Sequence, residues 1–524
     1  MQTTGQARSP WMWFPLPDFP PLTQDTRADV CVIGAGIAGM STAYLLTRKG
    51  RKVVVIDDGP IGSGMTSRTT AHLATAIDDR YYELERLHGE EGARLAATSH
   101  AAAVEAIEAI VTQERIDCDF ARVDGYLFLP PDGDPEELAS EYGAALRAGV
   151  EGVVWADRAP IDGFDTGRCL RFPRQGQFHP LKYLAGLARG IVREGGRIHC
   201  GVHAESVEDG DTPCVRTASG YRIECDDVVV ATNTPINDRV AIHTKQAPYM
   251  TYAIALRVPR GSVETALFWD TLDNYHYVRL EAPEGEMLIV GGEDHKTGQA
   301  DDAQRRFGDL ELWARERFPV AREVMHRWSG QVMETVDYLA FIGRNPGDRH
   351  VYVATGDSGM GMTHGTIAGI LITDLIHGAE VPWAKLYDPS RFPVKAAKDY
   401  LRENANVAAQ YTDWVKPGEV ASPEEIAAGS GAVYRRGVHK IAAYRDPQGR
   451  LHEMSAACTH LGCVVRWNSF ESTWDCKCHG SRFDAFGEVL NGPAVHALHP
   501  AESGSGPHVR NSRHAGEHPP TPGP

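Results

Sequence analysis

The chain has 524 residues, a formal net charge of −17 at pH 7 and an ordinary globular composition with 42% hydrophobic residues. This length allows two or three domains with full-sized cores, and the acidic balance argues against nucleic acid or an anionic membrane surface as a partner. No apolar run approaches the roughly 18–20 residues that span a bilayer, and most of the ten cysteines are scattered, so neither a membrane span nor a disulfide scaffold is expected.

Residues 1–27 form an N-terminal extension ahead of the first regular pattern. The segment contains aromatic residues and prolines, among them Trp11, Trp13 and Pro15. It has neither a basic stretch followed by an apolar core nor a twin-arginine pair, so no export signal is expected. This pattern favours a cytoplasmic protein.

A nucleotide-binding pattern follows. An apolar strand at 29–33 runs directly into Gly34-Ala-Gly36-Ile-Ala-Gly39 and a helix. In such a turn the first glycine permits the tight bend, the second lets the backbone approach a pyrophosphate, and the third lets helix and strand pack closely. The phosphates then lie at the helix N-terminus, where free N–H groups favour anions. The next strand ends at Asp57, where an acidic side chain would accept hydrogen bonds from a ribose.

The glycine pattern alone does not distinguish NAD from FAD, but two later stretches do so by resemblance. Residues 226–233 read Asp-Asp-Val-Val-Val-Ala-Thr-Asn, and residues 350–357 repeat the pattern before a glycine-rich turn and a helix at 366–376. Together these motifs resemble the D-amino-acid oxidase/glycine oxidase family, FAD-dependent oxidoreductases acting on amines and amino acids, over residues 28–385. The resemblance implies FAD, bound by Gly34, Gly36, Gly39, Asp57, Ala231, Thr232, Gly356, Gly359, Gly361, Met362 and Thr363.

The same resemblance implies the fold class of this part. Residues 28–80, 180–235 and 335–385 would form an α/β FAD-binding (Rossmann-like) domain, and the residues between them an antiparallel-sheet substrate domain. In the family, the late glycine-rich turn directs a helix N-terminus at the flavin pyrimidine, where charge builds up on reduction. Residues 64–72 would lie over the adenosine diphosphate and the flavin.

Covalent attachment of FAD is known in some relatives, through a histidine in the early loop or a cysteine near the late turn. His72 is the nearest histidine, and no cysteine lies between Thr355 and Leu371. An ordinary role for His72 is the alternative, and dissociable FAD is expected.

The substrate part is expected to contain helices at 81–95 and 101–113, a helix at 180–193 following it, and strands at 126–129, 248–257, 275–280 and 287–291. In the family, the sheet here forms a roof over the flavin and selects the substrate. His364 in the late turn is a catalytic candidate, with a capping or packing role as the alternative. Alternation along a strand makes about half of the strand candidates point away from the cavity. The strand candidates are Tyr252 and Tyr275 as catalytic residues, with His276, Tyr277 and Arg279 also within reach of a cavity.

Prolines and glycines mark a change of organisation after residue 385. We expect a helical linker at 386–425 with an amphipathic helix at 394–411, then a domain at 426–501, and a disordered tail at 502–524. Short strands bounded by turns predict a small all-β module, with strands at 431–436, 440–445, 451–455 and 463–467.

Two short segments of this module each bring one cysteine and one histidine. Cys458-Thr-His460 and Cys476-Lys-Cys-His479 are far enough apart for a strand pair to return the second segment to the first. This set fits a Rieske [2Fe–2S] centre, in which two thiolates hold one iron and two imidazoles the other. A structural zinc site takes the same ligand types and is the alternative, although zinc ligands usually pair as Cys-x2–4-Cys.

The segments also resemble the Rieske proteins of the cytochrome bc complexes, whose loops carry C-T-H-L-G-C and C-x-C-H-G-S. The resemblance implies a disulfide between Cys463 and Cys478, a hydrogen bond from Ser481 to a bridging sulfide, and a third loop over the cluster at 491–494. The family often has a tyrosine that donates to a cluster thiolate where this chain has Phe483. A missing donor destabilises the reduced cluster, which predicts a lower reduction potential than in relatives that carry the tyrosine.

The two halves together predict an FAD-dependent dehydrogenase that oxidises an amine or amino-acid C–N bond and passes electrons one at a time to the cluster. The expected partners are a small-molecule substrate and an electron acceptor or donor that docks near the cluster. A reductive flavoenzyme fed through the cluster and a non-enzymatic redox carrier or sensor are alternatives. A Rieske oxygenase is disfavoured, because it needs a 2-His-1-carboxylate iron site in a sizeable domain, and fewer than fifty residues follow His479.

Overall fold

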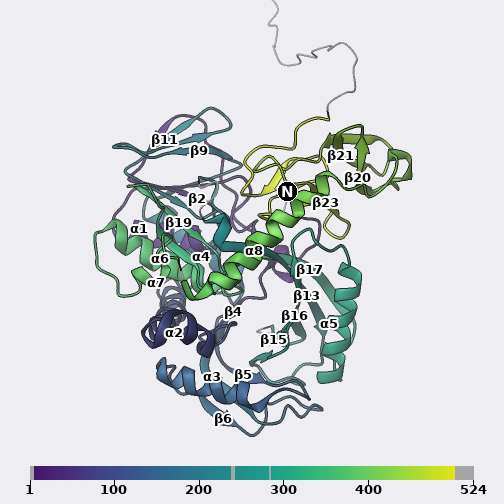
Figure 1. Ribbon diagram of the computed structural model, residues 1–524. Coiled ribbons are helices and arrows are strands. Elements are labelled where there is room, and N and C mark those ends of the chain that lie inside the picture. Colours follow the sequence, from purple (N-terminus) through teal and green to yellow (C-terminus); the bar gives the residue numbers. More distant parts are fainter. Residues whose placement is uncertain (1–4, 238–241, 282–284, 393, 502–524) are drawn as a thin grey trace, which may run out of the picture.

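The computed structural model describes residues 5–237, 242–281, 285–392 and 394–501. Its strands form five sheets, of which three belong to the long N-terminal part and two to the C-terminal module (Figure 1). Within the described residues, no helix combines the length and the apolarity needed to cross a bilayer.

A six-stranded sheet carries the nucleotide-binding motifs. Its order is β18-β19-β12-β2-β3-β8, with β18 antiparallel to β19 and all other neighbours parallel. Every residue of β2 and β19 is buried, as is typical of parallel strands with covered faces. The elements are β2 (Val30–Ile33), α1 (Ile37–Arg48), β3 (Val53–Asp57), α4 (Pro180–Arg193), β8 (Arg197–Cys200), β12 (Asp227–Val230), β18 (Phe341–Arg344), β19 (Val351–Thr355), α6 (Gly361–Ile376) and α7 (Ala384–Tyr387).

A nine-stranded, mostly antiparallel sheet forms the predicted substrate part. Its order is β17-β13-β16-β15-β14-β5-β7-β4, with β6 paired to β7 and only β14 and β5 parallel. Helix α5 packs on β13 and β16. The elements are β4 (His72–Leu73), α2 (Tyr81–Glu114), β5 (Ala121–Phe128), α3 (Pro135–Arg147), β6 (Val154–Ala156), β7 (Cys169–Gln177), β13 (Gln246–Arg257), β14 (Leu267–Asp270), β15 (Tyr277–Leu280), β16 (Met287–Lys296), α5 (Ala303–Arg317) and β17 (Val324–Thr335).

Two helical segments are present, as predicted at 81–95 and 101–113, but they meet at a kink within α2, so the predicted boundary between them is wrong. Helix α2 is interrupted at Gly89, which has φ +77° and ψ 171°, rather than after residue 95. The alanine-rich stretch at 96–103 has strong helix propensity and carries the helix through the predicted gap.

The N-terminal extension contains η1 (Pro10–Trp13), and β1 (Thr26–Arg27) at its end joins a small sheet. The order of that sheet is β1-β11-β10-β9, with β9 (Ala204–Glu208), β10 (Cys214–Thr217) and β11 (Arg222–Glu224).

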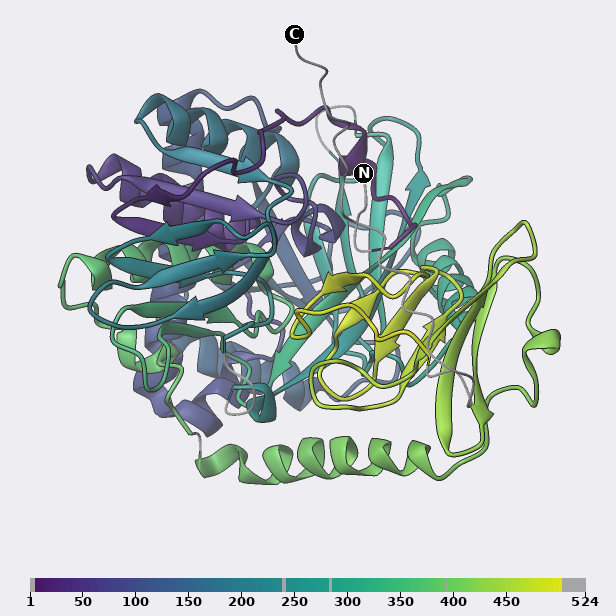
Figure 2. The ribbon, with the colours of Figure 1, turned by 90° about the horizontal axis from the view of Figure 1, so that it is seen from above.

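A single helix, α8 (Ala397–Gln410), connects the flavoprotein part to the C-terminal module, close to the predicted 394–411. Figures 1 and 2 show it running along the outside of the molecule. The module has sheets of order β20-β21-β22 and β23-β24-β25-β26. The predicted tail at 502–524 lies outside the described residues. The elements are β20 (Ser430–Arg436), β21 (His439–Arg445), β22 (Leu451–Ser455), β23 (Val465–Asn468), β24 (Thr473–Cys476), β25 (Arg482–Phe483) and β26 (Val489–Asn491).

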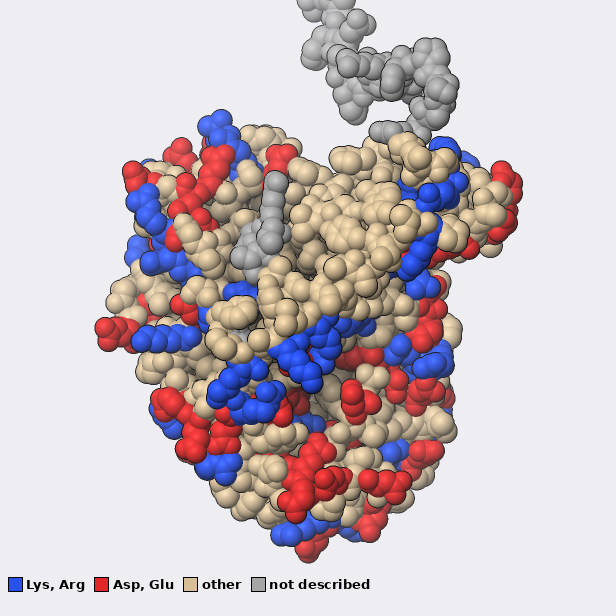
Figure 3. Space-filling view, in the orientation of Figure 1, with Lys and Arg blue, Asp and Glu red and all other residues tan. Residues whose placement is uncertain are grey.

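The module lies beside strands of the nine-stranded sheet, as Figure 2 shows for its yellow strands and the teal ones. The rings of Phe307 on α5 and Phe470 in the β23–β24 turn pack with centroids 4.8 Å apart. On the face seen in Figure 3, acidic and basic residues are interspersed. This face therefore lacks the continuous basic surface that nucleic-acid binding requires.

Candidate functional site

The turn between β2 and α1 has the geometry of a phosphate-binding turn. Gly34 has φ +106°, and a Cβ there would lie 2.4 Å from the carbonyl oxygen of Ala231. A Cβ on Gly39 would lie 1.9 Å from the carbonyl oxygen of Gly34. Gly36 is the N-cap of α1. The backbone can therefore approach a pyrophosphate at the helix N-terminus only because these positions carry no side chain.

Asp57 lies at the end of β3 beside this turn. Its Oδ2 accepts a hydrogen bond from the N–H of Ala35 at 2.6 Å, and its Oδ1 accepts one from Gly59 at 2.8 Å. Burial, and secondarily the nearby Asp58, raise the pKa of Asp57 to about 7. The carboxylate is held where a ribose hydroxyl would donate to it.

A cavity of about 760 Å³ joins the early and late nucleotide-binding motifs. This volume lies in the usual range of cofactor sites, about 300–1,000 Å³. Gly39 and Thr363 do not line the cavity; Thr363 lies behind its wall and donates from Oγ1 to the carbonyl of Met360 at 3.1 Å. The predicted FAD-binding residues that do line it are Gly34, Gly36, Asp57, Ala231, Thr232, Gly356, Gly359, Gly361 and Met362.

The late glycine-rich turn leads directly into α6. Gly359 has φ +72°, and a Cβ there would lie 2.3 Å from Oδ2 of Asp78. His364, in the first turn of α6, lines the cavity, and its Nδ1 is 2.9 Å from the carbonyl oxygen of Asp357. Burial lowers the pKa of His364 to about 4, so the ring is neutral at pH 7. The Nε2 of this ring has no hydrogen-bond partner among the described residues.

Among the candidates on the substrate sheet, Tyr275 and Tyr277 line the cavity. The hydroxyl of Tyr275 donates to Oδ2 of Asp78 at 2.8 Å, and that of Tyr277 is 2.8 Å from Oγ1 of Thr251. The bond between Tyr275 and Asp78 connects the substrate part to the loop after β4, a pairing across almost 200 residues that sequence spacing does not reveal.

Tyr252 is separated from the other catalytic candidates. It does not line the cavity but packs against Phe307 and hydrogen-bonds Nε2 of His295 at 3.0 Å on the other face of the sheet. Thr251 lines the cavity instead, because neighbouring residues of β13 point to opposite faces. The prediction that Tyr252 reaches the cavity is therefore wrong.

His276 and Arg279 do not reach the cavity either. His276 stacks on Trp313 with centroids 4.4 Å apart and pairs with Asp270 at 2.9 Å. Arg279 donates to buried backbone carbonyls, including that of Ala71 at 2.9 Å. Both side chains support the sheet rather than the cavity.

His72, the candidate for covalent attachment, lines the cavity. Its Nδ1 lies 3.1 Å from Oγ1 of Thr70 and its Nε2 lies 3.3 Å from the carbonyl of Val278. Burial, with Arg279 nearby, lowers its pKa to about 3. Both ring nitrogens have hydrogen-bond partners, and dissociable FAD stays a prediction.

The predicted cluster ligands meet at one end of the β23–β24 hairpin. The imidazole rings of His460 and His479 have centroids 5.0 Å apart. The thiol of Cys458 accepts backbone N–H groups of His460 and Leu461, and that of Cys476 accepts those of Cys478 and His479. Two sulfurs that accept backbone N–H groups, beside two imidazole rings, are a donor set that suits a [2Fe–2S] cluster.

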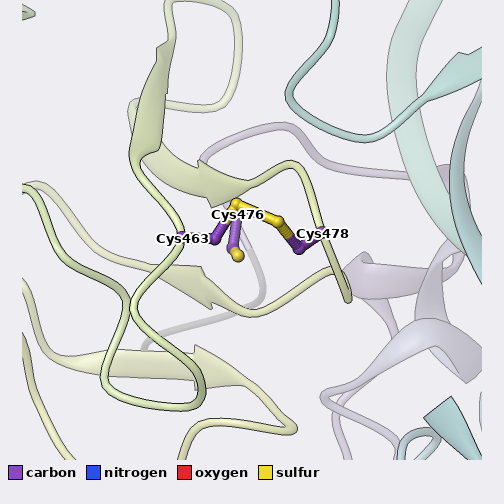
Figure 4. Close-up of side chains that lie close together, drawn as sticks. All are labelled: Cys463, Cys476 and Cys478. Carbon is purple, nitrogen blue, oxygen red and sulfur yellow. A yellow bond between two sulfur atoms is a disulfide. The ribbon is translucent and has the colours of Figure 1, made fainter. Parts of the chain in front are cut away.

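The implied disulfide is present. Cys463 and Cys478 are bonded across the two loops, and Figure 4 shows this bond beside the separate sulfur of Cys476. The ligand atoms of these three cysteines lie within 4.8 Å of one another. Two of the three sulfurs form the disulfide, so the group is not a metal site of its own, and Cys476 is the one that keeps a thiol for the cluster.

The third loop closes on the second. The N–H of Ala494 donates to Oγ of Ser481 at 3.0 Å, and Ser481 also hydrogen-bonds Cys458. Ser481 and Phe483 are fully buried. Ser481 can therefore donate to the sulfur of a predicted cluster ligand, whereas Phe483, buried in the same module, has no donor group.

We expect Phe483→Tyr to raise the midpoint potential of the cluster, because a phenolic O–H near a thiolate stabilises the more negative reduced state. The measurement is a redox titration followed by electron paramagnetic resonance. Phe486→Tyr, on an exposed ring of the same module, is the matched control and should leave the potential unchanged. An unchanged potential in Phe483→Tyr would contradict the expectation.

A histidine that sequence reasoning missed covers the imidazole edge of the cluster site. His243, in η3 (His243–Lys245) of the flavoprotein part, is 2% exposed. Its ring centroid lies 5.1 Å from that of His460 and 6.0 Å from that of His479. A lone histidine between two motifs carries no sequence signal, and only the folded chain brings it there.

Two further contacts join the cofactor sites. Nε2 of Gln331, a residue that lines the cavity, donates to the carbonyl of Gly480 at 2.9 Å, next to the ligand His479. Arg68, which also lines the cavity, pairs with Glu471 of the module at 2.7 Å, and both side chains are fully buried. The flavin cavity and the cluster loops therefore share a packed, polar interface.

A Rossmann-like sheet, a mostly antiparallel substrate sheet and a module with two Cys/His loops define a flavoprotein with a fused iron–sulfur centre. Comparison with known proteins agrees. The family model described as "FAD dependent oxidoreductase" (DAO) matches residues 29–375, and that described as "Rieske [2Fe-2S] domain" matches residues 416–502. The chain belongs to the DAO family of FAD-dependent oxidoreductases and carries a C-terminal Rieske domain.

Named relatives show the same pattern. YhfW of Bacillus subtilis (strain 168), named as a Rieske 2Fe-2S iron-sulfur protein, is 33% identical over 491 residues, 92% of this chain and 95% of that protein. Gamma-glutamylputrescine oxidoreductase of Escherichia coli (strain K12) is 28% identical over 69% of this chain and 86% of that protein. Glycine oxidase from Geobacillus kaustophilus superposes with a TM-score of 0.59 at 19% identity, covering 70% of this chain and 99% of that one. The predicted fold class, FAD and the [2Fe–2S] cluster are confirmed, and the zinc alternative is excluded by the Rieske match.

Proposed function

We propose that the protein is a dehydrogenase that oxidises the C–N bond of an amine or amino acid and passes the electrons singly to the Rieske cluster of the same chain. FAD, when bound, accepts two electrons as a hydride, and a [2Fe–2S] cluster carries one electron at a time. The observation that carries the proposal is the shared cavity wall. Residues 488–492 and 494–497 of the Rieske module line the same cavity as the FAD-binding motifs.

Residues of the chain itself support the proposed assignment of hydride transfer to the FAD site and of single-electron transfer to the cluster. The N-terminus of α6, which carries a partial positive charge, faces the cavity. His364 beside it is neutral and adds no further charge there. Gln331 reaches from the cavity wall to the loop of His479. The C–N specificity is supported by the relatives, whose names include a putrescine-derivative oxidoreductase and a glycine oxidase.

An external one-electron partner completes the proposal. His479 is 7% exposed and His243 covers the imidazole edge, whereas Leu461, next to His460, is 39% exposed. The loop that carries Leu461 is therefore the side on which a partner can approach the cluster. We also propose a cytosolic location. Six of the ten cysteines are neither disulfide-bonded nor predicted cluster ligands, and unpaired thiols suit a reducing compartment.

An anaerobic titration of the holoprotein with a panel of amines and amino acids tests the function. We expect one compound to bleach the flavin absorbance and then the cluster absorbance. Bleaching of both bands by dithionite but by no compound would contradict the proposal and favour reverse electron flow or a sensor.

A further inference from the structure

We propose that the substrate is a linear di- or polyamine, a cation with no carboxylate beside the carbon that is oxidised. This inference rests on the proposed function and names the substrate class of the same site. It is drawn from the charge, the hydrogen bonding and the aromatic lining of the cavity.

Five half-buried carboxyl groups line the cavity away from the ribose-binding acid. They come from the loop after β4, from β16, from β17 and from the loop after β19, so separate parts of the chain contribute to one acidic lining. Burial raises the pKa of each of them, to about 7 for Asp294 and about 6 for Asp357. The groups are Asp78, Asp79, Asp294, Glu334 and Asp357.

Positive charge to balance these groups is scarce. Among the described lining residues, Arg68 is the only lysine or arginine. Its guanidinium already donates to Glu471 and to the carbonyl of Ser329, each at 2.7 Å. The lining residues His72 and His364 have pKa values lowered to about 3 and about 4, chiefly by burial, and are neutral at pH 7. Arg80 and Arg306 act on the carboxyl groups of Asp78 and Asp294 from outside the lining. On the cavity wall itself, a substrate carboxylate would meet carboxyl groups and one arginine that is already paired.

Two carboxylate oxygens in the cavity are without a partner among the described residues. These are Oδ1 of Asp294 and Oε1 of Glu334, both buried. Other oxygens of the set are already satisfied, such as Oδ2 of Asp78 by the hydroxyl of Tyr275. An ammonium group offers three donors and no acceptor, so it complements these unpaired oxygens and supplies the missing charge.

A metal ion does not explain the acidic lining. In the described part of the chain, the one set of three or more His, Cys, Asp or Glu side chains whose ligand atoms lie within 4.8 Å of one another is the cysteine group at the cluster. The cavity carboxylates are spread out instead of converging on a point. Several separate carboxyl groups, each of which a nearby ammonium group would favour in its ionised form, fit an extended molecule with more than one cationic nitrogen.

Aromatic rings complete an ammonium-binding surface. Trp269, Tyr275 and Tyr277 all line the cavity, and the two tyrosine rings have centroids 5.6 Å apart. Ring faces attract ammonium groups, and the apolar parts of the rings pack against methylene chains. Carboxyl groups and aromatic rings in one lining suit the nitrogens and the methylenes of a polyamine, respectively.

The reaction balances with the cofactors that the family supplies. An ammonium R–CH2–NH3⁺ first gives one proton to a cavity carboxylate. FAD, when bound, would supply the hydride acceptor. Loss of a hydride from carbon and of a second proton from nitrogen would leave R–CH=NH, which water converts to an aldehyde and ammonia. The two electrons would leave singly through the cluster to two equivalents of a one-electron acceptor.

Binding and turnover are measured separately on the oxidised holoprotein. Calorimetry with 1,4-diaminobutane, spermidine, glycine, sarcosine and L-proline gives affinities, and anaerobic bleaching of the flavin gives turnover. We expect the two polyamines to bind and to bleach the flavin. Glu334→Gln and Asp294→Asn should each weaken polyamine binding about tenfold or more, as loss of a charged hydrogen bond does. Glu323→Gln, the same change on an exposed residue beside β17, should leave the affinity unchanged.

The outcomes separate this inference from the proposed function. Polyamine binding that weakens in Glu334→Gln, with no bleaching, supports the cationic site but contradicts C–N oxidation by this protein. Bleaching by an amino acid with no polyamine binding supports the proposed function and overturns the inference. Polyamine binding that is unchanged in both Glu334→Gln and Asp294→Asn also overturns it.

Discussion

Replacing Glu471 by alanine is expected to destabilise the docking of the Rieske module on the flavoprotein part by about 3–5 kcal/mol. Arg68 and Glu471 form a 2.7 Å ion pair in which both side chains are fully buried. Glu471 also accepts hydrogen bonds from the hydroxyl of Ser329 at 2.6 Å and the N–H of Ala7 at 3.0 Å. Removing the carboxylate leaves a buried guanidinium without its counter-charge, and a guanidinium cannot lose its proton to escape the cost.

Urea denaturation followed by flavin fluorescence and by cluster absorbance measures this effect. Asp374→Ala, which removes an exposed pair with Lys49, is the control and should change the free energy of unfolding by less than about 1 kcal/mol. The double variant Arg68→Leu, Glu471→Leu should recover much of the loss, since two apolar side chains replace two buried charges. A Glu471→Ala variant as stable as Asp374→Ala would contradict the argument.

The same pair gives the docking a pH dependence. Burial by itself raises the pKa of Glu471, but Arg68 and the hydrogen-bond donors outweigh it, and the pKa is lowered overall. A lowered pKa in the folded state means that the stabilisation is complete above about pH 4.3, the ordinary value for Glu, and is lost as the pH falls through the folded pKa. The docking interface should therefore weaken as the pH falls below about 4.3 and keep this stabilisation at neutral pH.

Gly39→Ala is expected to give a protein that retains the cluster but purifies without FAD. The new Cβ would lie 1.9 Å from the carbonyl oxygen of Gly34. This is a backbone atom, which cannot turn aside as the end of a flexible side chain could. Overpacking costs about 1–3 kcal/mol, and here the displaced group is the turn whose N–H donors would hold the pyrophosphate.

The flavin content after gel filtration, relative to the cluster content, measures the effect. Gly308→Ala is the matched control, because Gly308 lies within α5 and a Cβ there meets no neighbouring atom within 4 Å. It should retain both cofactors and be equally or more stable. A Gly39→Ala protein with a full complement of FAD would show that this turn does not hold the dinucleotide.

Most of the fold and both cofactor motifs could be predicted because their signals are local in sequence. The glycines of the β2–α1 turn lie within six residues, and each cluster loop brings its cysteine and histidine within four. Helix α4 begins and ends at the predicted residues because apolar periodicity and an N-terminal Pro180 mark it directly.

The parts that could not be predicted depend on pairing between distant segments. His243 meets the cluster histidines, and Arg68 meets Glu471, only after two domains pack together. The inward-facing residue of β13 is Thr251 and not Tyr252, and the β13–β16 register shifts between Met250 and Tyr252. Strand register decides which face a side chain occupies, and a sequence without its sheet partners does not fix register.

The central claim is that electrons pass between flavin and cluster within one chain. Flash photoreduction of the flavin in the anaerobic holoprotein tests it without a substrate, by following flavin reoxidation and cluster reduction in the same sample. We predict that both signals change together with a first-order rate that is independent of protein concentration and is slower in Glu471→Ala. A rate that rises in proportion to protein concentration, or a cluster that stays oxidised while the flavin is reduced, would contradict the account.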